Sequence, residues 1–278
     1  MSGLARLTRN RRGLLGGVVV AAMLAAGLLA PAVSPYSYST QSLLQRLKPP
    51  TPAHWLGTDG FGRDILTRVI WGARVSLEIG FLATGLAILA GTAMGGTAGY
   101  FGGAADTAIM RVADVFMSVP ALFLILVVVA LFGASLLNTA LVVGLVTWPP
   151  VARIVRGECL TLRARDFVEA ARALGASHGR ILARHVLVNA VPAIIVQGTL
   201  LLGQTILIES GLSYLGLGVQ PPTPSWGNMV VEGRQFLGSA WWVSTFPGLA
   251  IFATVLGFNL FGDGLRDALD PALRSGSR

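Results

Sequence analysis

The sequence predicts an all-α integral membrane protein with six transmembrane helices. Only 12% of its 278 residues are charged, whereas 53% are hydrophobic and the mean hydropathy is +0.68. Soluble domains carry about 25% charged residues, so this chain has too little charge to cover a water-exposed surface. A spanning helix needs about 20 mostly apolar residues. Six runs meet this condition: 14–33, 77–100, 115–133, 136–151, 190–208 and 241–261.

The distribution of basic residues predicts the orientation of these runs. Fifteen of the 21 lysines and arginines fall in the N-terminal segment, in the second and fourth connections and in the tail. Six alternating spans place all these segments on one side, and the basic-rich side of a membrane protein is cytoplasmic. We therefore expect the N-terminal segment 1–13, the loop 153–189 and both termini in the cytoplasm. The net charge of +8 does not indicate nucleic-acid binding, because the basic residues flank apolar runs and form no stripe with aromatic residues.

The first run and the connection after it admit more than one interpretation. Arg11 and Arg12 before the run, with Ala30-Pro31-Ala32 at its end, would also suit a cleaved signal peptide. The apolar core exceeds the usual length of about 7–15 residues, so we expect a retained span. The connection ends in GRDILTRVIWGARVSL, where apolar residues recur at helical spacing. This pattern predicts an interfacial helix that lies along the membrane before the second span.

The later runs contain three features that bear on packing and transport. Gly91, Gly95 and Gly99 recur every four residues, which predicts a close helix–helix contact. Trp148-Pro149-Pro150 predicts a kink or an early end of the fourth run. Polar side chains in the fifth and sixth runs either line a translocation path or form interhelical hydrogen bonds. They are Gln197, Gln204, Thr205 and Asn259.

The sequence contains no motif that indicates a catalytic, nucleotide-binding or metal-binding site. Its single lysine, Lys48, precedes a proline, so no Gly-Lys-Ser/Thr phosphate-binding loop exists. Cys159 is the only cysteine, and the histidine pair His178 and His185 has no acidic cluster beside it. We therefore expect no catalytic, cofactor-binding or metal site. Acidic residues near the runs fall at or near their ends, which argues against an ion-coupled carrier.

The loop after the fourth run predicts a helical hairpin under the membrane. A helix-forming stretch runs from Arg163 to Leu174, and Gly175 follows it in a C-cap position. Ser177 suits the N-cap of a second helix that runs from His178 towards Val188. Small side chains at Ala170 and Ala171 would let a partner approach closely. The charges of Asp166, Glu169 and Arg172 would then orient that partner.

These residues carry a resemblance to a known family. Glu169-Ala170-Ala171, followed after three residues by Gly175, resembles the EAA loop of bacterial ABC importer permeases. Over about residues 50–272 the chain is similar to the C-type subunit of the dipeptide/oligopeptide/nickel permeases, and its tail is closest to dipeptide permeases. The family's closing Leu-Pro pair is replaced here by Leu187-Val188, with Pro192 four residues later. The supporting stretches are HWLGTDGFGRD (54–64), MRVADVFMSVP (110–120), LGLGVQPPTPSWG (215–227) and FNLFGDGLRDALDP (258–271).

The resemblance implies a type I ABC importer permease fold and a non-enzymatic translocation subunit in the bacterial cytoplasmic (inner) membrane. It implies as partners a homologous second permease, two ABC ATPase subunits that hold ATP and Mg²⁺, and an extracytoplasmic solute-binding protein. Peptides are the expected cargo, with nickel or another small solute as the alternative within the family. An ion-coupled secondary transporter is the alternative from another class. The coupling residues that the resemblance implies are Glu169, Ala170, Ala171, Arg172 and Gly175.

Overall fold

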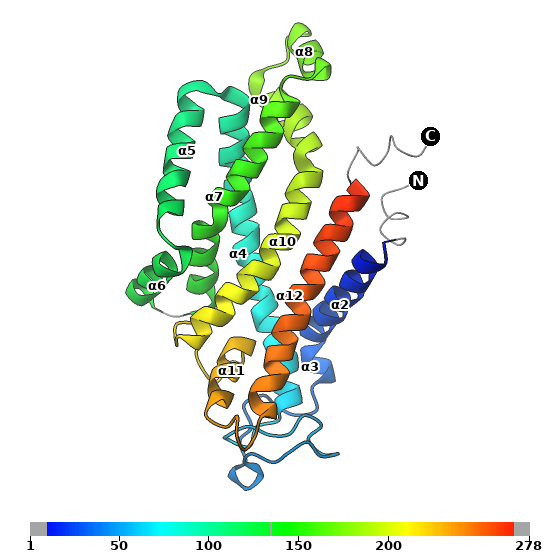
Figure 1. Cartoon of the computed structure of the whole chain (residues 1–278), viewed down its shortest axis with the longest axis vertical. Coiled ribbons are helices and arrows are strands. Elements are labelled where there is room, and N and C mark those ends of the chain that lie inside the picture. Colours follow the sequence, from blue (N-terminus) through cyan, green and yellow to red (C-terminus); the bar gives the residue numbers. More distant parts are fainter. Residues whose placement is uncertain (1–9, 134, 270–278) are drawn as a thin grey trace.

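The protein is a bundle of long helices, as the computed structural model shows for residues 10–133 and 135–269 (Figure 1). Within these ranges the only β pairing is an isolated bridge between Thr58 and Asp64. The elements are α2 (Arg11–Leu28), α3 (Ala30–Val33), η1 (Leu43–Gln45), α4 (Ile65–Phe101), α5 (Gly103–Ser118), α6 (Ala121–Phe132), α7 (Leu136–Leu162), α8 (Asp166–Ala173), α9 (His178–Ile181), η2 (Leu182–Val186), α10 (Leu187–Tyr214), α11 (Trp226–Arg234) and α12 (Trp242–Leu269).

Length and composition identify the helices that can cross a membrane. In the described part of the chain five helices qualify: α2, α4, α7, α12 and the continuous stretch His178–Tyr214. A sixth crossing results if the bent pair of α5 and α6 counts as one span. The all-α membrane fold is therefore confirmed. Figure 1 shows α8 at one end of the bundle and α3 and α11 at the other; we call these the α8 end and the α11 end.

The predicted interfacial helix before the second span is wrong. α4 is one helix of 37 residues that begins at Ile65, and the Asp64 carboxylate caps it by accepting the Thr67 N–H at 2.8 Å. Arg63 and Arg68, which belong to this polar and apolar pattern, are buried inside the protein. These polar side chains bind other residues of the same chain and not lipid headgroups, so the segment continues directly into the second span.

The predicted third span, 115–133, is divided between two helices. Its first residues belong to α5, and α6 leaves α5 at an angle of 84°. Val119 and Pro120 separate the two helices in extended conformations, with φ of −106° and −55°. Proline disfavours helical geometry in the residue before it and lacks an N–H, which accounts for the bend at this position.

Two predicted helix ends lie elsewhere. α7 continues through Pro149 and Pro150 to Leu162, so the predicted early end of the fourth run is wrong. Prolines are tolerated in spanning helices where neighbouring helices surround them. The second loop helix does not end at Val188 either, because α9 and the π-helical turn η2 lead directly into α10. The loop therefore contains one free-standing helix, α8, and not a hairpin of two.

The predicted close packing of the glycine stripe on α4 is confirmed. A Cβ atom at Gly95 would lie 2.3 Å from the Ala152 carbonyl oxygen on α7. At Gly91 it would lie 2.6 Å from the Val151 Cβ. Distances this short are not compatible with any side chain, so the two helices approach each other through backbone atoms. This contact joins α4 rigidly to α7.

A buried charge network closes the α11 end. The Asp59 carboxylate accepts hydrogen bonds from Arg63 Nε at 2.6 Å and from Arg68 Nη1 at 2.7 Å. Glu232 on α11 pairs with Arg63 Nη2 at 2.6 Å. Burial raises the pKa of Glu232, and the charge of Arg63 opposes that rise. The network (Asp59, Arg63, Arg68 and Glu232) ties the start of α4 to α11.

Candidate functional site

The loop that the sequence singled out forms a short capped helix at the α8 end (Figure 1). Gly175 has a φ of +76°, as the left-handed residue after a helix requires. Its N–H donates to the Arg172 carbonyl at 2.9 Å, and the Ala176 N–H donates to the Ala171 carbonyl at 3.1 Å. These two bonds form a Schellman motif. The predicted role of Gly175 as the residue that ends the helix is confirmed.

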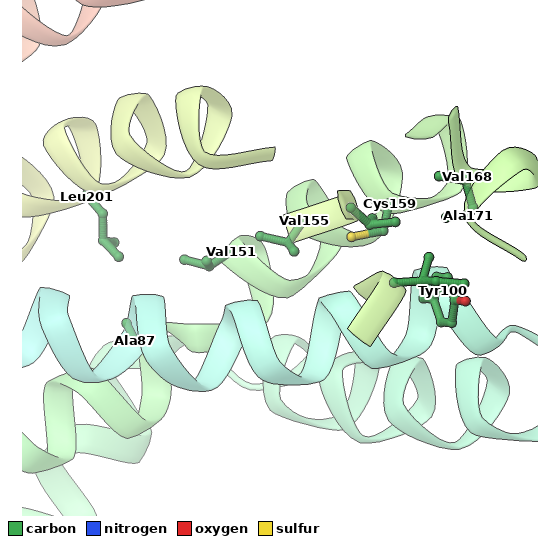
Figure 2. Close-up of a cluster of buried hydrophobic side chains, with 10 residues drawn as sticks. Ala87, Tyr100, Val151, Val155, Cys159, Val168, Ala171 and Leu201 are labelled. Carbon is green, nitrogen blue, oxygen red and sulfur yellow. The ribbon is translucent and has the colours of Figure 1, made fainter. Parts of the chain in front are cut away.

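The two faces of α8 differ in what they contact. Val168 and Ala171 are buried and pack against the same core as Cys159 on α7 (Figure 2). The expectation that both alanines of the motif present themselves to a partner is therefore wrong for Ala171. Ala171 lies on the face of α8 that packs against the rest of the chain. The exposed face carries Glu169, Ala170, Arg172 and Gly175.

Two apolar side chains on the exposed face were missed by the sequence analysis. Leu174 is 88% exposed and Phe167 is 40% exposed. The available signal was that Phe167 and Leu174 are the largest apolar side chains in a short, charged and alanine-rich segment. Large apolar side chains at the tip of a loop favour contact with another protein.

α9 begins directly after the turn. Ser177 occupies its N-cap position, as predicted, although its side chain makes no capping hydrogen bond. His178, the first residue of α9, lies beside the ring of Tyr100 on α4, and its Nδ1 is 3.0 Å from the Tyr100 hydroxyl. No group of three or more metal-ligating side chains occurs among the residues that the structure describes.

An open pocket of about 500 Å³ lies between α8 and the end of α4. We call it the Tyr100 pocket. Two residues of the predicted coupling set, Glu169 and Arg172, line it. The other lining residues are Tyr100, Phe101, Arg163, Ala164 and His178.

The predicted path residues do not meet in one site. Gln197 lines a second cavity of about 520 Å³ between α7, α10 and α12, together with Glu158 and Arg266. Gln204 and Asn259 are exposed on the surface of α10 and α12. Asn259 lies against Gly203 of α10, where an added Cβ would be 3.5 Å from its Oδ1.

Two further polar residues of α10, Thr205 and Glu209, contact α4. The Thr205 hydroxyl lies 3.3 Å from the Thr84 hydroxyl on α4. Glu209 is fully buried and accepts hydrogen bonds from Ser213 at 2.7 Å and from Ser76 at 3.2 Å. No sequence pattern links Glu209 to Ser76, because 133 residues separate them.

Comparison with known proteins identifies the family. The model described as "binding-protein-dependent transport system inner membrane component" matches residues 87–275, which is more than half of the chain. The chain belongs to this family. The family match includes the whole of α8 and the turn at Gly175. A second model, described as the N-terminal TM domain of oligopeptide transport permease C, matches residues 3–50.

The similarity to individual members of the family extends over nearly the full chain. It is 42% identical over 270 residues to the dipeptide transport system permease protein DppC of Alkalihalophilus pseudofirmus, covering 97% of this chain and 89% of that protein. It is 42% identical over 271 residues to the glutathione transport system permease protein GsiD of Pectobacterium atrosepticum, covering 97% and 90%. The resemblance inferred from the motifs is confirmed.

Among solved structures the chain is similar in fold to a chain of the MetNI methionine ABC transporter in an inward-facing conformation. The TM-score is 0.57 at 18% sequence identity, and the match covers 74% of this chain and 97% of that chain. This likeness confirms the type I ABC importer permease fold.

Proposed function

We propose that this family member is the translocation subunit of an ATP-driven importer that moves di- or oligopeptides across the cytoplasmic membrane. The observation that carries the proposal is α8: a capped, partly apolar helix that projects at one end of a chain without a phosphate-binding loop. Energy from ATP must therefore reach this chain through another subunit. The relatives are named as dipeptide and glutathione transport permeases, and these names support peptides as the cargo.

The proposed assembly has a homologous second permease, two ABC ATPase subunits and an extracytoplasmic solute-binding protein. In this arrangement α8 docks on an ATPase subunit through Glu169, Ala170, Arg172 and the turn at Gly175, while Ala171 holds α8 to the bundle. The α8 end and both termini face the cytoplasm. Gln197, Gln204 and Asn259 lie on helices that would face the second permease and contribute polar groups to the path between the two subunits.

Uptake by the reconstituted complex tests the function. Proteoliposomes that contain the complete importer should accumulate a labelled dipeptide only with ATP inside the compartment that the α8 end faces. Accumulation driven by an ion gradient without ATPase subunits would instead establish a secondary transporter. Uptake of Ni²⁺ in place of peptides, under the same conditions, would establish the alternative cargo.

Replacement of Gly175 tests the coupling assignment. A Cβ at Gly175 would meet nothing within 4 Å, so a large side chain there extends into solvent unless a partner is docked. A Gly175→Trp importer should insert normally but lose about tenfold or more of its ATP-driven uptake, since a change of 1.4 kcal/mol corresponds to tenfold. Gly175→Asn is the control, because asparagine tolerates the left-handed conformation and adds little bulk. Equal uptake by the two variants would contradict docking at this turn.

A further inference from the structure

The Tyr100 pocket collects more positive than negative charge. Arg163 at the end of α7, Arg172 on α8 and His178 on α9 line it, and Glu169 supplies its only carboxylate. Neither arginine forms an ion pair with a carboxylate in the part of the chain that the structure describes. Two arginines earlier on α7 differ, because Arg156 pairs with Asp106 and Arg153 pairs with Asp114.

Tyr100 holds the three basic groups in place. Its backbone carbonyl accepts a hydrogen bond from Arg163 Nη1 at 3.3 Å. The Arg172 guanidinium lies over its ring at 5.9 Å from the centroid, and its hydroxyl bonds to His178. Tyr100 itself is only 4% exposed, so its position is fixed by the core beneath it. The pocket therefore has two guanidinium groups beside Tyr100 that form no ion pair with a carboxylate of the described residues.

We propose that the Tyr100 pocket receives an acidic side chain of the ATPase subunit, whose carboxylate pairs with Arg163 and Arg172. This inference rests on the proposed function and adds the chemistry of recognition to it. Arginine favours carboxylates because its planar guanidinium can donate two parallel hydrogen bonds. The exposed side chain of Leu174, which follows the last residue of α8, offers the partner an apolar contact at the same end of the bundle.

A protein partner suits this pocket better than a lipid headgroup. α8 lies beyond the ends of α4, α7 and α10 in Figure 1, so this helix projects past the long apolar helices. A protein can place a basic side chain against Glu169 next to the acidic side chain that meets the arginines, whereas a layer of anionic headgroups offers only negative charge. An acidic residue with a basic neighbour on the ATPase would match the whole pocket.

Neutral substitutions in the purified importer test the proposal. In the double variant Arg163→Gln/Arg172→Gln, the amount of bound ATPase subunit should fall about tenfold or more, and uptake should fall with it. The reason is that loss of one side of a close charge pair costs well over about 1.4 kcal/mol. Binding of the remaining ATPase should depend less steeply on salt than in the unsubstituted importer, since the screened ion pair is gone. A role confined to folding would leave that salt slope unchanged.

Arg165→Gln is the matched control. Arg165 is exposed, precedes α8 directly and does not line the pocket. If the Arg165→Gln variant bound as little ATPase subunit as the double variant, the inference would be wrong. With Arg172→Glu, one Asp→Arg or Glu→Arg substitution in the ATPase should restore binding. If binding instead follows the anionic lipid content of the vesicles, the pocket takes a headgroup and the proposal is wrong.

The proposed function has a separate test in the same experiment. If the unsubstituted chain retains no ATPase subunit at all, the proposed function fails. If it retains ATPase and the double variant matches Arg165→Gln, the function stands and only the inference about the pocket fails.

Discussion

At the scale of single residues, Asp59 carries the densest set of contacts at the α11 end. One of its carboxylate oxygens accepts from both Arg63 and Arg68, and the other accepts the backbone N–H groups of Phe61 and Arg63. Asp59 and both arginines are buried. The carboxylate therefore compensates two positive charges that have little access to water.

Asp59→Asn should destabilise the protein strongly. The amide keeps the shape but removes the charge, which leaves Arg63 and Arg68 with Glu232 alone. Breaking a buried ion pair costs about 3–5 kcal/mol. The thermal midpoint in detergent should fall accordingly, measured by the reaction of the single, buried Cys159 with a fluorescent maleimide. Asp114→Asn is the control, because its pair with Arg153 is 47% exposed on both sides and such pairs are worth less than about 1 kcal/mol.

Single residues also show the limits of inference from sequence. Gly175 could be predicted because a glycine after a helix-forming run has one common structural reason, the left-handed C-cap. Ala171 could not, because adjacent alanines look alike until the helix is placed on its core. Glu232 could not be linked to Arg63, because 169 residues separate them and only the fold brings α11 to the start of α4.

At the scale of elements, α4 connects the two ends of the molecule. Its first turn joins the Asp59 network and its last turn forms the floor of the Tyr100 pocket. Between these points the glycine stripe fixes it against α7. At Gly99 an added Cβ would lie 2.6 Å from the Arg156 carbonyl oxygen, so the contact persists to the end of the helix.

Gly95→Ala should separate α4 from α7. The new methyl group would overlap the Ala152 carbonyl, and overpacking of this kind costs about 1–3 kcal/mol. Gly85→Ala on the same helix meets nothing within 4 Å, and there the change should be neutral or stabilising by about 0.5–1 kcal/mol because alanine favours helix. Melting curves from Cys159 labelling compare the two variants. Equal midpoints would contradict close packing at Gly95.

Apolar runs predicted which elements exist but not where they end. A hydropathy run stops at the first charged residues, whereas α4, α7 and α10 continue as helices past the apolar region. Those added turns are stabilised by contacts within the protein, such as the hydrogen bond from Arg68 to Asp59, which composition does not record. The bend before α6 was encoded by Val119-Pro120, but the surrounding hydrophobicity obscured it.

At the scale of the whole molecule, chain segments far apart in sequence share each end. Asn10 at the start of α2 donates to Asp267 near the end of α12 at 2.9 Å, so both lie together. The connection before α4 contacts the opposite end of α12, where Trp242 Nε1 donates to the Thr58 carbonyl at 3.2 Å. The count of basic residues predicts which end faces the cytoplasm, and cysteine labelling can test that orientation.

Ala104→Cys and Leu44→Cys should react from opposite sides of the membrane. Ala104 is exposed and follows the last turn of α4 at the α8 end, whereas Leu44 is 89% exposed in the connection at the α11 end. Cys159 is fully buried and gives no background with a membrane-impermeant maleimide. Spheroplasts should label Leu44→Cys alone, and inverted vesicles should label Ala104→Cys alone, because basic-rich segments are retained in the cytoplasm. The reverse pattern would place α8 outside the cell, where no ATPase could reach it, and would refute the proposed coupling.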